Sequence, residues 1–570
     1  MLIYFKFFFG TKSKKSLEKK VILMSIRVEL LKDKKTLFEE LNSLNCKLED
    51  LERIKMIIEF LDKEPVIEIV DKLNQEFDKI IGNPAIPRQI LIGTLLYCFN
   101  DYMDKYSDIA RRTRTDEIIK VFTCNTSLSE SLFRKFLNES DPEVINDLFV
   151  YTLVQFNDSG ILKFLHFFLD GSNAISRGSK YTIIRKSDVE LLHWLDDNNL
   201  TYLRKNKRSL NSRLNKLEKM KEQGEYPPEM IDKVLKRINE RPNLFTQEMA
   251  KKLLLFDEEF QKRNVDVLCI TFPQAVKHKT KHGGWDYGFN LQQVMSDKNI
   301  ILTTVLLQEA NDFNTMDKVL PVLKKTFEKL KDMQKEYGHR RNYKEIESML
   351  EEAILVCDAG YWSQKNIIYL SSTEYKALIM PSSIARYINK RQSEQNKKEK
   401  EPILTEKEEK EVKKYLKSSK TDWKREYMKY KCKMGRILKY IGFRATTKKE
   451  ILEQNKGLPL KHRKKEFIFK SENCNGCPLK KKCTHKRVIE MVSLVQFEMI
   501  NKFTLKKYRK IYAKRFNKSE SINGYFKSIN GVYHLIGNNP IAINNEVTIK
   551  SLLYNLVRLT QLKKTRCDLD

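Results

Sequence analysis

A short apolar stretch that runs straight into a carboxylate constrains the fold of this chain more than any other feature. Residues 353–357 are all apolar, and Asp358 and then Gly360 follow them. Such a run is typical of a strand buried on both faces, as in a sheet covered by helices. Asp358 would then lie at the carboxyl end of that strand, where open α/β sheets bind their ligands. The alternative is that Asp358 only starts a turn, a position that Asp favours.

A second run has the same form. Residues 161–169 are largely apolar and lead into Asp170 and the small residue Gly171. A simple turn is again the alternative. Two such strand ends in one chain raise the question of whether their carboxylates meet.

The neighbouring segments predict a mixed sheet. Two β-rich segments, 285–295 and 300–307, flank a turn at 296–299 and indicate a hairpin. An amphipathic helix is expected over about 315–336, and a last strand over 375–380. The order is then strand, hairpin, helix, strand, helix, strand. This is the order of an α/β ribonuclease H-like fold, so we predict a mixed five-stranded sheet flanked by helices.

The charge of the chain limits its partners. Its 570 residues carry a formal net charge of +32, and the pI is near 9.5. A protein this basic usually meets a polyanion, nucleic acid first and an anionic membrane surface second. The apolar run at 2–9 is too short to span a membrane and contains Lys6. We therefore expect a cytoplasmic protein that binds DNA and no membrane, and the dispersed Cys residues fit a reducing compartment.

The expected elements divide the chain into an α/β core and the segments that interrupt it. The core is expected at 161–187 with Asp170, at 263–387 with Asp358, and at 491–570 with a late helix that contains Glu520 and the C-terminal tail. The other segments are an N-terminal extension outside the core at 1–24, an all-α N-terminal domain at 25–160, a helical hairpin insertion at 188–262, and a basic insertion with a Cys cluster at 388–490. The basic helices of the N-terminal domain either read DNA as a helix-turn-helix does or form a plain bundle with a solvated face.

Four cysteines form a candidate structural metal site, namely Cys432, Cys474, Cys477 and Cys483. Cys474 and Cys477 form a C-x-x-C pair, and its turn brings two sulfurs within reach of one Zn²⁺ ion. An iron–sulfur cluster would use the same ligands, and His485 is a substitute ligand. Reduced cysteines without a metal are the alternative.

A late helical segment supplies a third carboxylate. Glu520, Gly524 and Lys527 differ by four and three residues and therefore share one helix face. Glu520 and Lys527 either meet a phosphate backbone or form an ordinary surface ion pair. If Asp170, Asp358 and Glu520 meet at one sheet edge, their oxygens suit Mg²⁺ or Mn²⁺. Two such ions can activate a water or a 3′-hydroxyl for in-line attack on a phosphodiester.

These motifs together resemble those of the DDE transposases of bacterial insertion sequences. Leu169-Asp170-Gly171 resembles the first strand of that family, Tyr287-Gly-Phe-Asn-Leu-Gln292 the second, and Cys357-Asp-Ala-Gly-Tyr361 its Asp-Ala-Gly-Tyr signature. The pair Asn311-Asp312, the Cys cluster and the helical segment from Pro84 to Asn138 also have counterparts there. The resemblance covers most of the chain between Pro84 and Asn538.

The Tyr-Arg-Glu-Lys signature of this family maps onto the late helix. Four residues separate Arg515 from Glu520, where the best-known form of the signature has three. The resemblance implies that two Mg²⁺ or Mn²⁺ ions are held by Asp170, Asp358 and Glu520. It implies that the scissile backbone is positioned by Tyr512, Arg515 and Lys527.

The implied activity is metal-dependent cleavage at transposon ends, followed by strand transfer into target DNA. The implied partners are double-stranded DNA, both terminal inverted repeats and target, and a homodimer or larger assembly at the DNA ends. The implied location is the bacterial cytoplasm, at the nucleoid when the enzyme is active. Two alternatives stay open: a ribonuclease H-like DNA nuclease without strand transfer, and an inactive DNA-binding derivative.

Overall fold

The structure is a computed structural model of the whole chain. It describes residues 33–77, 86–103, 105–162, 165–176, 183–198, 210–224, 226–240, 252–279, 284–339, 343–373, 375–381, 438–470, 474, 477, 487–503, 505–528 and 534–567. The expected N-terminal extension at 1–24 lies outside these residues. Among the helices described, none is both long and apolar enough to cross a membrane.

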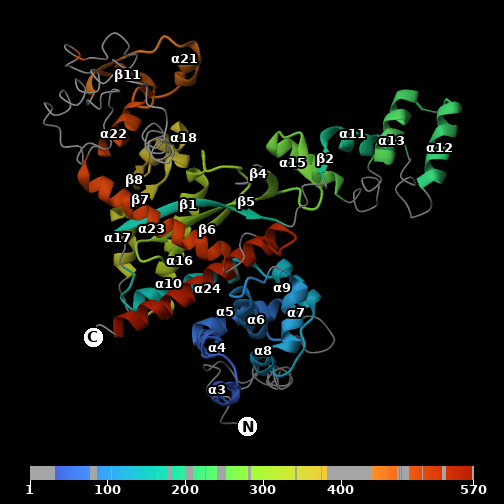
Figure 1. The fold of residues 1–570 in the computed structure, drawn as a ribbon, viewed down its shortest axis with the longest axis vertical. Coiled ribbons are helices and arrows are strands. Elements are labelled where there is room, and N and C mark those ends of the chain that lie inside the picture. The colour runs from blue at the N-terminus through green and yellow to red at the C-terminus, as the bar shows by residue number, and fades with distance from the viewer. Residues whose placement is uncertain are drawn as a thin grey trace, which may run out of the picture.

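A mixed sheet forms the centre of the fold (Figure 1). Its strands are β1 (His166–Ile175), β4 (Val276–Lys279), β5 (Trp285–Ser296), β6 (Ile301–Leu307), β7 (Ile354–Cys357) and β8 (Lys376–Ile379). They follow the order β4-β5-β1-β7-β8, and β6 also pairs with β5. β4 pairs with residues 285–288 of β5, whereas β6 pairs with residues 290–295. β5 is antiparallel to β1 and β6, whereas β7 and β8 run parallel to β1. The predicted mixed sheet flanked by helices is therefore confirmed, and β4 is an additional strand.

The buried strands follow the pattern expected from their apolar runs. Phe167 and Phe168 are both buried although they point to opposite faces of β1, because both faces of the sheet are covered. The strand begins later than the apolar run at 161 and continues past Asp170. The hairpin turn is also as predicted, with Asn299 in the left-handed region at a φ of 59°.

Three helices lie around the second half of the sheet, and the sequence analysis expected the first and the last of them. They are α16 (Met316–Tyr337), α17 (Tyr343–Glu352) and α18 (Gln364–Ser371). The side chain of Ser363 caps α18 by accepting a hydrogen bond from the backbone N–H of Asn366 at 3.0 Å.

Eight helices described before the sheet pack into the same core as the sheet. They are α3 (Lys34–Ser43), α4 (Leu48–Leu61), α5 (Glu64–Phe77), α6 (Arg88–Phe99), α7 (Tyr106–Thr115), α8 (Glu117–Phe122), α9 (Glu130–Glu139) and α10 (Pro142–Asp158). α10 packs against α16, so a single hydrophobic cluster runs from these helices to the strands. The N-terminal helices are thus part of the central body and not a separately packed bundle.

The C-terminal helix α24 (Pro540–Cys567) joins the N-terminal helices to the sheet with buried polar side chains. Asn555 pairs with both backbone groups of Ile301 in β6, at 3.0 Å each. Asn545 donates to the carbonyls of Leu137 and Ser140, at 3.0 and 2.9 Å. Because each side chain satisfies backbone groups of another element, α24 fixes those elements in place.

Two appended units have hydrophobic cores of their own. The first contains β2 (Ile183–Arg185), α11 (Lys186–Asp197), α12 (Leu210–Glu222), α13 (Pro228–Glu240), α15 (Leu253–Arg263) and β3 (Val267–Cys269). The second contains β9 (Lys439–Arg444), α21 (Lys449–Asn455), β10 (Lys465–Lys470), β11 (Arg487–Val492) and α22 (Leu494–Lys502).

The first unit, which we call the insertion, projects away from the sheet (Figure 1). It contains the expected pair α12 and α13, but adds α11, α15 and a two-stranded sheet of β2 and β3. The second unit includes a three-stranded antiparallel sheet, β9 to β11, which the sequence analysis did not predict.

Candidate functional site

The two strand-end carboxylates lie beside each other because their strands are parallel neighbours. Leu169 of β1 pairs with Cys357 of β7, so Asp170 and Asp358 follow at the same level of the sheet. Asp170 belongs to β1 and is buried, whereas the side chain of Asp358 is 33% exposed. The sequence analysis expected Asp170, Asp358 and Glu520 to meet. The structure brings the first two to the same end of neighbouring strands, and the convergence of all three stays a prediction.

Arg515 lies between these carboxylates. Its Nη2 is 2.7 Å from Oδ1 of Asp170 and 3.6 Å from Oδ2 of Asp358. It comes from α23 (Lys506–Ser528), which packs on β1 and β7. Burial disfavours the charged guanidinium, but the two carboxylates outweigh burial and raise the pKa of Arg515 above its usual value. The cation remains charged and ties the late helix to the end of both strands.

Burial also shapes the other ionisable groups here. It raises the pKa of Asp170, and the neighbouring Arg515 offsets part of that effect. Tyr512 lies one turn before Arg515 on α23, and burial raises its pKa to about 12. The phenol is therefore neutral at physiological pH and can donate a hydrogen bond.

Asp358 serves two contacts at once. Its Oδ1 accepts a hydrogen bond from the N–H of Gly360 at 2.7 Å and caps the short 3₁₀ turn η3 (Ala359–Tyr361). Its other oxygen faces Arg515. The alternative that Asp358 only starts a turn thus accounts for Oδ1, whereas Oδ2 is directed at Arg515.

Asp312 is a third carboxylate at this site; the sequence analysis noted it in the pair Asn311-Asp312 and did not include it among the candidate site residues. It lies in the segment between β6 and α16, where its Oδ1 accepts hydrogen bonds from Asn290 at 3.0 Å and Gln292 at 2.7 Å. Burial raises the pKa of Asp312, and these two donors lower it. The signal for it was present in β5, because Asn290 and Gln292 place polar side chains on one face of a buried strand.

Two glycines allow Asp312 to approach the other carboxylates. A Cβ on Gly171 would lie 2.0 Å from Oδ1 of Asp312, which no real side chain tolerates. A Cβ on Gly360 would lie 3.0 Å from Oδ1 of Asp358 and 3.3 Å from Oδ2 of Asp312. Asp312 can therefore approach this closely only because residue 171 is Gly. A side chain at position 360 would have little room.

A buried tyrosine holds this arrangement from beneath. The hydroxyl of Tyr361 donates to Oε1 of Gln292 at 2.5 Å, and the amide of Gln292 donates in turn to Asp312. The carbonyl of Tyr361 accepts a hydrogen bond from the side chain of Asn366 at 3.0 Å. This network connects β5, η3 and α18, so the position of Asp312 depends on three elements.

Glu520 and Lys527 lie on the same helix as Arg515, and their side chains are outside the described residues. An α-helix turns by about 100° per residue, so the Cα of Glu520 lies about 140° around the axis from that of Arg515. A spacing of four positions would give about 40°. The five-position spacing of this chain therefore separates the two residues around the helix.

The metal predictions concern two places. Within the described residues, no group of three or more His, Cys, Asp or Glu side chains is arranged to hold a metal ion. At the strand ends, the oxygens of Asp170 and Asp358 are of the type that Mg²⁺ and Mn²⁺ prefer, and the guanidinium of Arg515 already bridges them as a cation. These two residues fit a divalent ion once Arg515 is drawn away.

The cysteine site can be followed only in part. Cys432, Cys483 and the substitute ligand His485 lie outside the described residues. The N–H of Cys477 donates to the carbonyl of Cys474 at 3.3 Å, which is the tight turn expected of a C-x-x-C pair. Zinc or iron–sulfur binding therefore stays a prediction.

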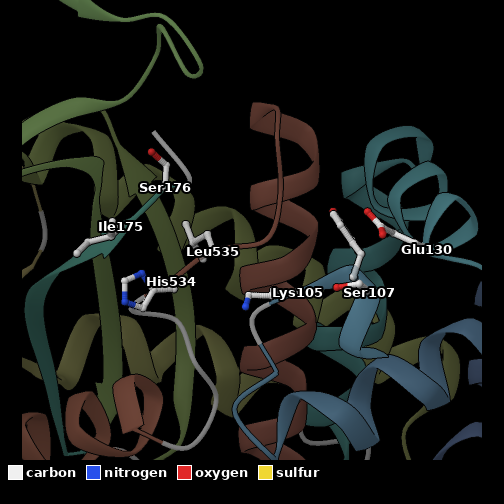
Figure 2. A pocket seen from close by; sticks show the side chains of 8 residues that line it. Lys105, Ser107, Glu130, Ile175, Ser176, His534 and Leu535 are labelled. Atoms are coloured by element: carbon white, nitrogen blue, oxygen red, sulfur yellow. The ribbon is translucent and has the colours of Figure 1, made fainter. Parts of the chain in front are cut away.

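A separate hollow of about 300 Å³ lies between the start of α7 and the end of β1 (Figure 2). It is lined by Lys105, Tyr106, Ser107, Glu130, Ile175, Ser176, His534 and Leu535. None of the carboxylates described above lines it. The candidate site is therefore an arrangement of side chains at the strand ends and not this pocket.

Comparison of the chain with protein-family models, with curated proteins and with solved structures found no match.

Proposed function

We propose that this chain is a DDE transposase of an insertion sequence, which cleaves DNA at transposon ends and joins the new 3′-ends to target DNA. The strand order supports the proposal. Without β4, the sheet reads β6-β5-β1-β7-β8, with β5 antiparallel to the other four strands. That order and those directions are the ones expected of a ribonuclease H-like domain.

The contact of Arg515 with both strand-end carboxylates carries the proposal. Asp170, Asp358 and Arg515 are far apart in the sequence, yet they meet at one edge of the sheet. The same contact brings α23, which contains Glu520, to that edge. A solvated ion pair would not need a buried strand end, two glycines and a third carboxylate around it.

These residues have distinct roles in the proposed reaction. Asp170 and Asp358 would hold the divalent ions, with Glu520 as the third predicted ligand. A bound Mg²⁺ or Mn²⁺ ion would activate a water or a 3′-hydroxyl of the DNA for attack and would stabilise the leaving oxygen. Arg515 would exchange its carboxylate partners for the scissile phosphate, and Tyr512 would donate a hydrogen bond to the adjacent backbone. The net charge of +32 attracts the DNA.

The test separates DNA binding from cleavage. Terminal inverted repeats found in the DNA that borders the gene supply the substrate duplex. Asp358→Asn should bind this duplex as the wild-type protein does, and its cleavage rate should fall by about 100- to 1,000-fold. Asp332→Asn is the matched control, because that side chain is 78% exposed on α16. Undiminished Mg²⁺-dependent cleavage by Asp358→Asn would contradict the proposal.

A second assay distinguishes a transposase from a nuclease of the same fold. A duplex with a precut 3′-end is offered together with a supercoiled plasmid. Joining of the end to the plasmid supports strand transfer. Cleavage of the uncut duplex without any joining would assign the chain to the nuclease class.

A further inference from the structure

Gln293 is a fully buried side chain of the central sheet whose amide has no hydrogen-bond partner among the described residues. This holds for both of its polar atoms, Oε1 and Nε2. Leaving a buried amide unpaired lowers stability, and buried polar side chains in folded proteins therefore nearly always have partners. An exception of this kind has two physical explanations: a buried water, or a second state of the protein in which the amide is paired.

The position of Gln293 in the sheet places it beside Asp170. The two residues lie directly opposite each other in the antiparallel pair of β1 and β5. Opposite residues share one face of a sheet, and their Cβ atoms are about 4.5–5.5 Å apart, so a Gln side chain can reach the carboxylate. On this same face, Arg515 of α23 contacts Asp170. Gln293 therefore faces the candidate site from within the sheet.

The neighbours of Gln293 on this face bond to other elements. Asp170 accepts a hydrogen bond from Nη2 of Arg515 at 2.7 Å. On the other side, Thr304 of β6 lies opposite Gln293. The hydroxyl of Thr304 pairs with that of Ser551 in α24 at 3.1 Å. The amide of Gln293 thus lies between two side chains that are engaged elsewhere.

The preceding residue shows how a structural glutamine is bonded in the same strand. Gln292 is equally buried, but it points to the opposite face of the sheet. Its Nε2 donates to Asn290 at 2.8 Å and to Asp312 at 2.7 Å, and its Oε1 accepts the hydroxyl of Tyr361 at 2.5 Å. Both polar atoms of Gln292 therefore have partners, whereas those of Gln293 have none in the described part of the chain.

We propose that Gln293 is a positioning residue for Asp170, and that it forms its hydrogen bond when Arg515 moves away. The inference rests on the proposed function, in which Arg515 exchanges its carboxylate partners for the scissile phosphate. That exchange takes from the buried Asp170 the hydrogen bond that Arg515 donates. Nε2 of Gln293 then donates to the carboxylate and fixes the orientation in which it meets a divalent ion. Hydrogen bonds of this kind orient the carboxylate ligands of metal sites.

A buried water is the alternative, and it predicts a different stability. A water that pairs with the amide stabilises the metal-free protein, so replacing Gln293 by an apolar residue would lower stability. The positioning role predicts the reverse, because an apolar side chain of similar size has no polar atom to leave unpaired. The two explanations therefore differ in the sign of the stability change.

The experiment measures stability and metal binding on the same full-length variants. In EDTA, Gln293→Met should raise the thermal midpoint by about 2–4 °C, because it removes the unpaired amide. In the complex with the terminal-repeat duplex, it should weaken Mn²⁺ binding, followed by electron paramagnetic resonance, by about 10- to 100-fold. The Mn²⁺ that Asp358→Asn fails to bind identifies the site.

Gln292→Met is the matched control, because it makes the same change one residue earlier in the strand. It removes hydrogen bonds that are present in the metal-free protein, so its thermal midpoint should fall. Gln293→Leu is a second apolar variant at the tested position. It should shift the thermal midpoint and the Mn²⁺ affinity in the same directions as Gln293→Met.

Two results would overturn the inference and leave the proposed function standing. One is a lower thermal midpoint for both Gln293 variants, which assigns the amide to a buried water. The other is an unchanged Kd for the Mn²⁺ that Asp358→Asn loses. If the wild-type complex binds no Mn²⁺ that depends on Asp358, the inference and the metal chemistry of the proposed function fail together.

Discussion

Two helical regions, the N-terminal helices before β1 in the sequence and the insertion after it, pack in different ways. The N-terminal helices share one hydrophobic cluster with the sheet, and α24 fastens them with side chains such as Asn545 and Asn555. The insertion packs α11, α12, α13 and α15 around a hydrophobic cluster of its own, and it projects away from the sheet (Figure 1). Helical content and basic charge alone would have made the two regions look alike. Shared burial, and not helical pattern, therefore decides which helices form one packed body with the central sheet.

The buried ion pair of α24 should show the largest effect. Glu546 and Lys550 are fully buried and 2.6 Å apart, and Glu546 also accepts the N–H groups of Ile536 and Gly537 at 2.8 and 2.9 Å. Glu546→Gln leaves the charge of Lys550 without its counter-ion, so the free energy of unfolding should fall by about 3–5 kcal/mol. Denaturant unfolding should show the N-terminal helices and the sheet losing stability together.

The double variant Glu546→Gln/Lys550→Met is the control for that prediction. It removes both charges and should recover most of the lost stability. Independent unfolding of the N-terminal helices in Glu546→Gln would contradict the single shared core.

A smaller change tests the independence of the insertion. Ile231 is fully buried in its core, and Ile231→Val should lower the local unfolding free energy by about 1 kcal/mol. Amide hydrogen exchange should speed up in α12, α13 and α15 and stay unchanged in β1 and β7. Faster exchange in β1 or β7 would contradict the independence of the insertion from the central sheet.

The smallest effect is expected where the insertion returns to the sheet. His278 lies buried in β4, and burial lowers its pKa below the usual 6.5. As the pH falls through 6.5, the unfolded chain binds a proton that the folded chain does not yet bind, so stability declines from there down to the lowered folded value. His278→Gln should flatten part of this loss in thermal unfolding between pH 7 and 5. An identical pH dependence in the variant would mean that His278 does not contribute to it, and would contradict the view that β4 unfolds together with the sheet.

Much of the sheet could be predicted from the sequence because its determinants are local. Buried parallel strands are apolar at nearly every position, and the polar residues at 296–299 indicate the hairpin turn. That Asp170 and Asp358 end two separate apolar runs was also visible in the sequence, and it raised the question of whether they meet. The assignment of the fold to the ribonuclease H-like class, and of the chain to the transposases, remains a proposal.

Other features depend on long-range packing that no local pattern records. Asp312 approaches the site because Gly171 leaves room and because β5 supplies two amides. The pairing of Lys550 with Glu546 reads in sequence like an ordinary exposed helix pair at positions i and i+4, yet both side chains are buried. The sequence analysis did not predict the sheet of β9 to β11, because its segment is highly charged.

The most direct test of the central claim is a crystal of the full chain with cut DNA and Mn²⁺, in which anomalous scattering locates the metal. The account predicts an anomalous peak coordinated by Asp170 and Asp358, with Arg515 moved from between them to the DNA backbone. A complex with DNA bound, Arg515 still bridging both carboxylates and no anomalous peak beside them would contradict it.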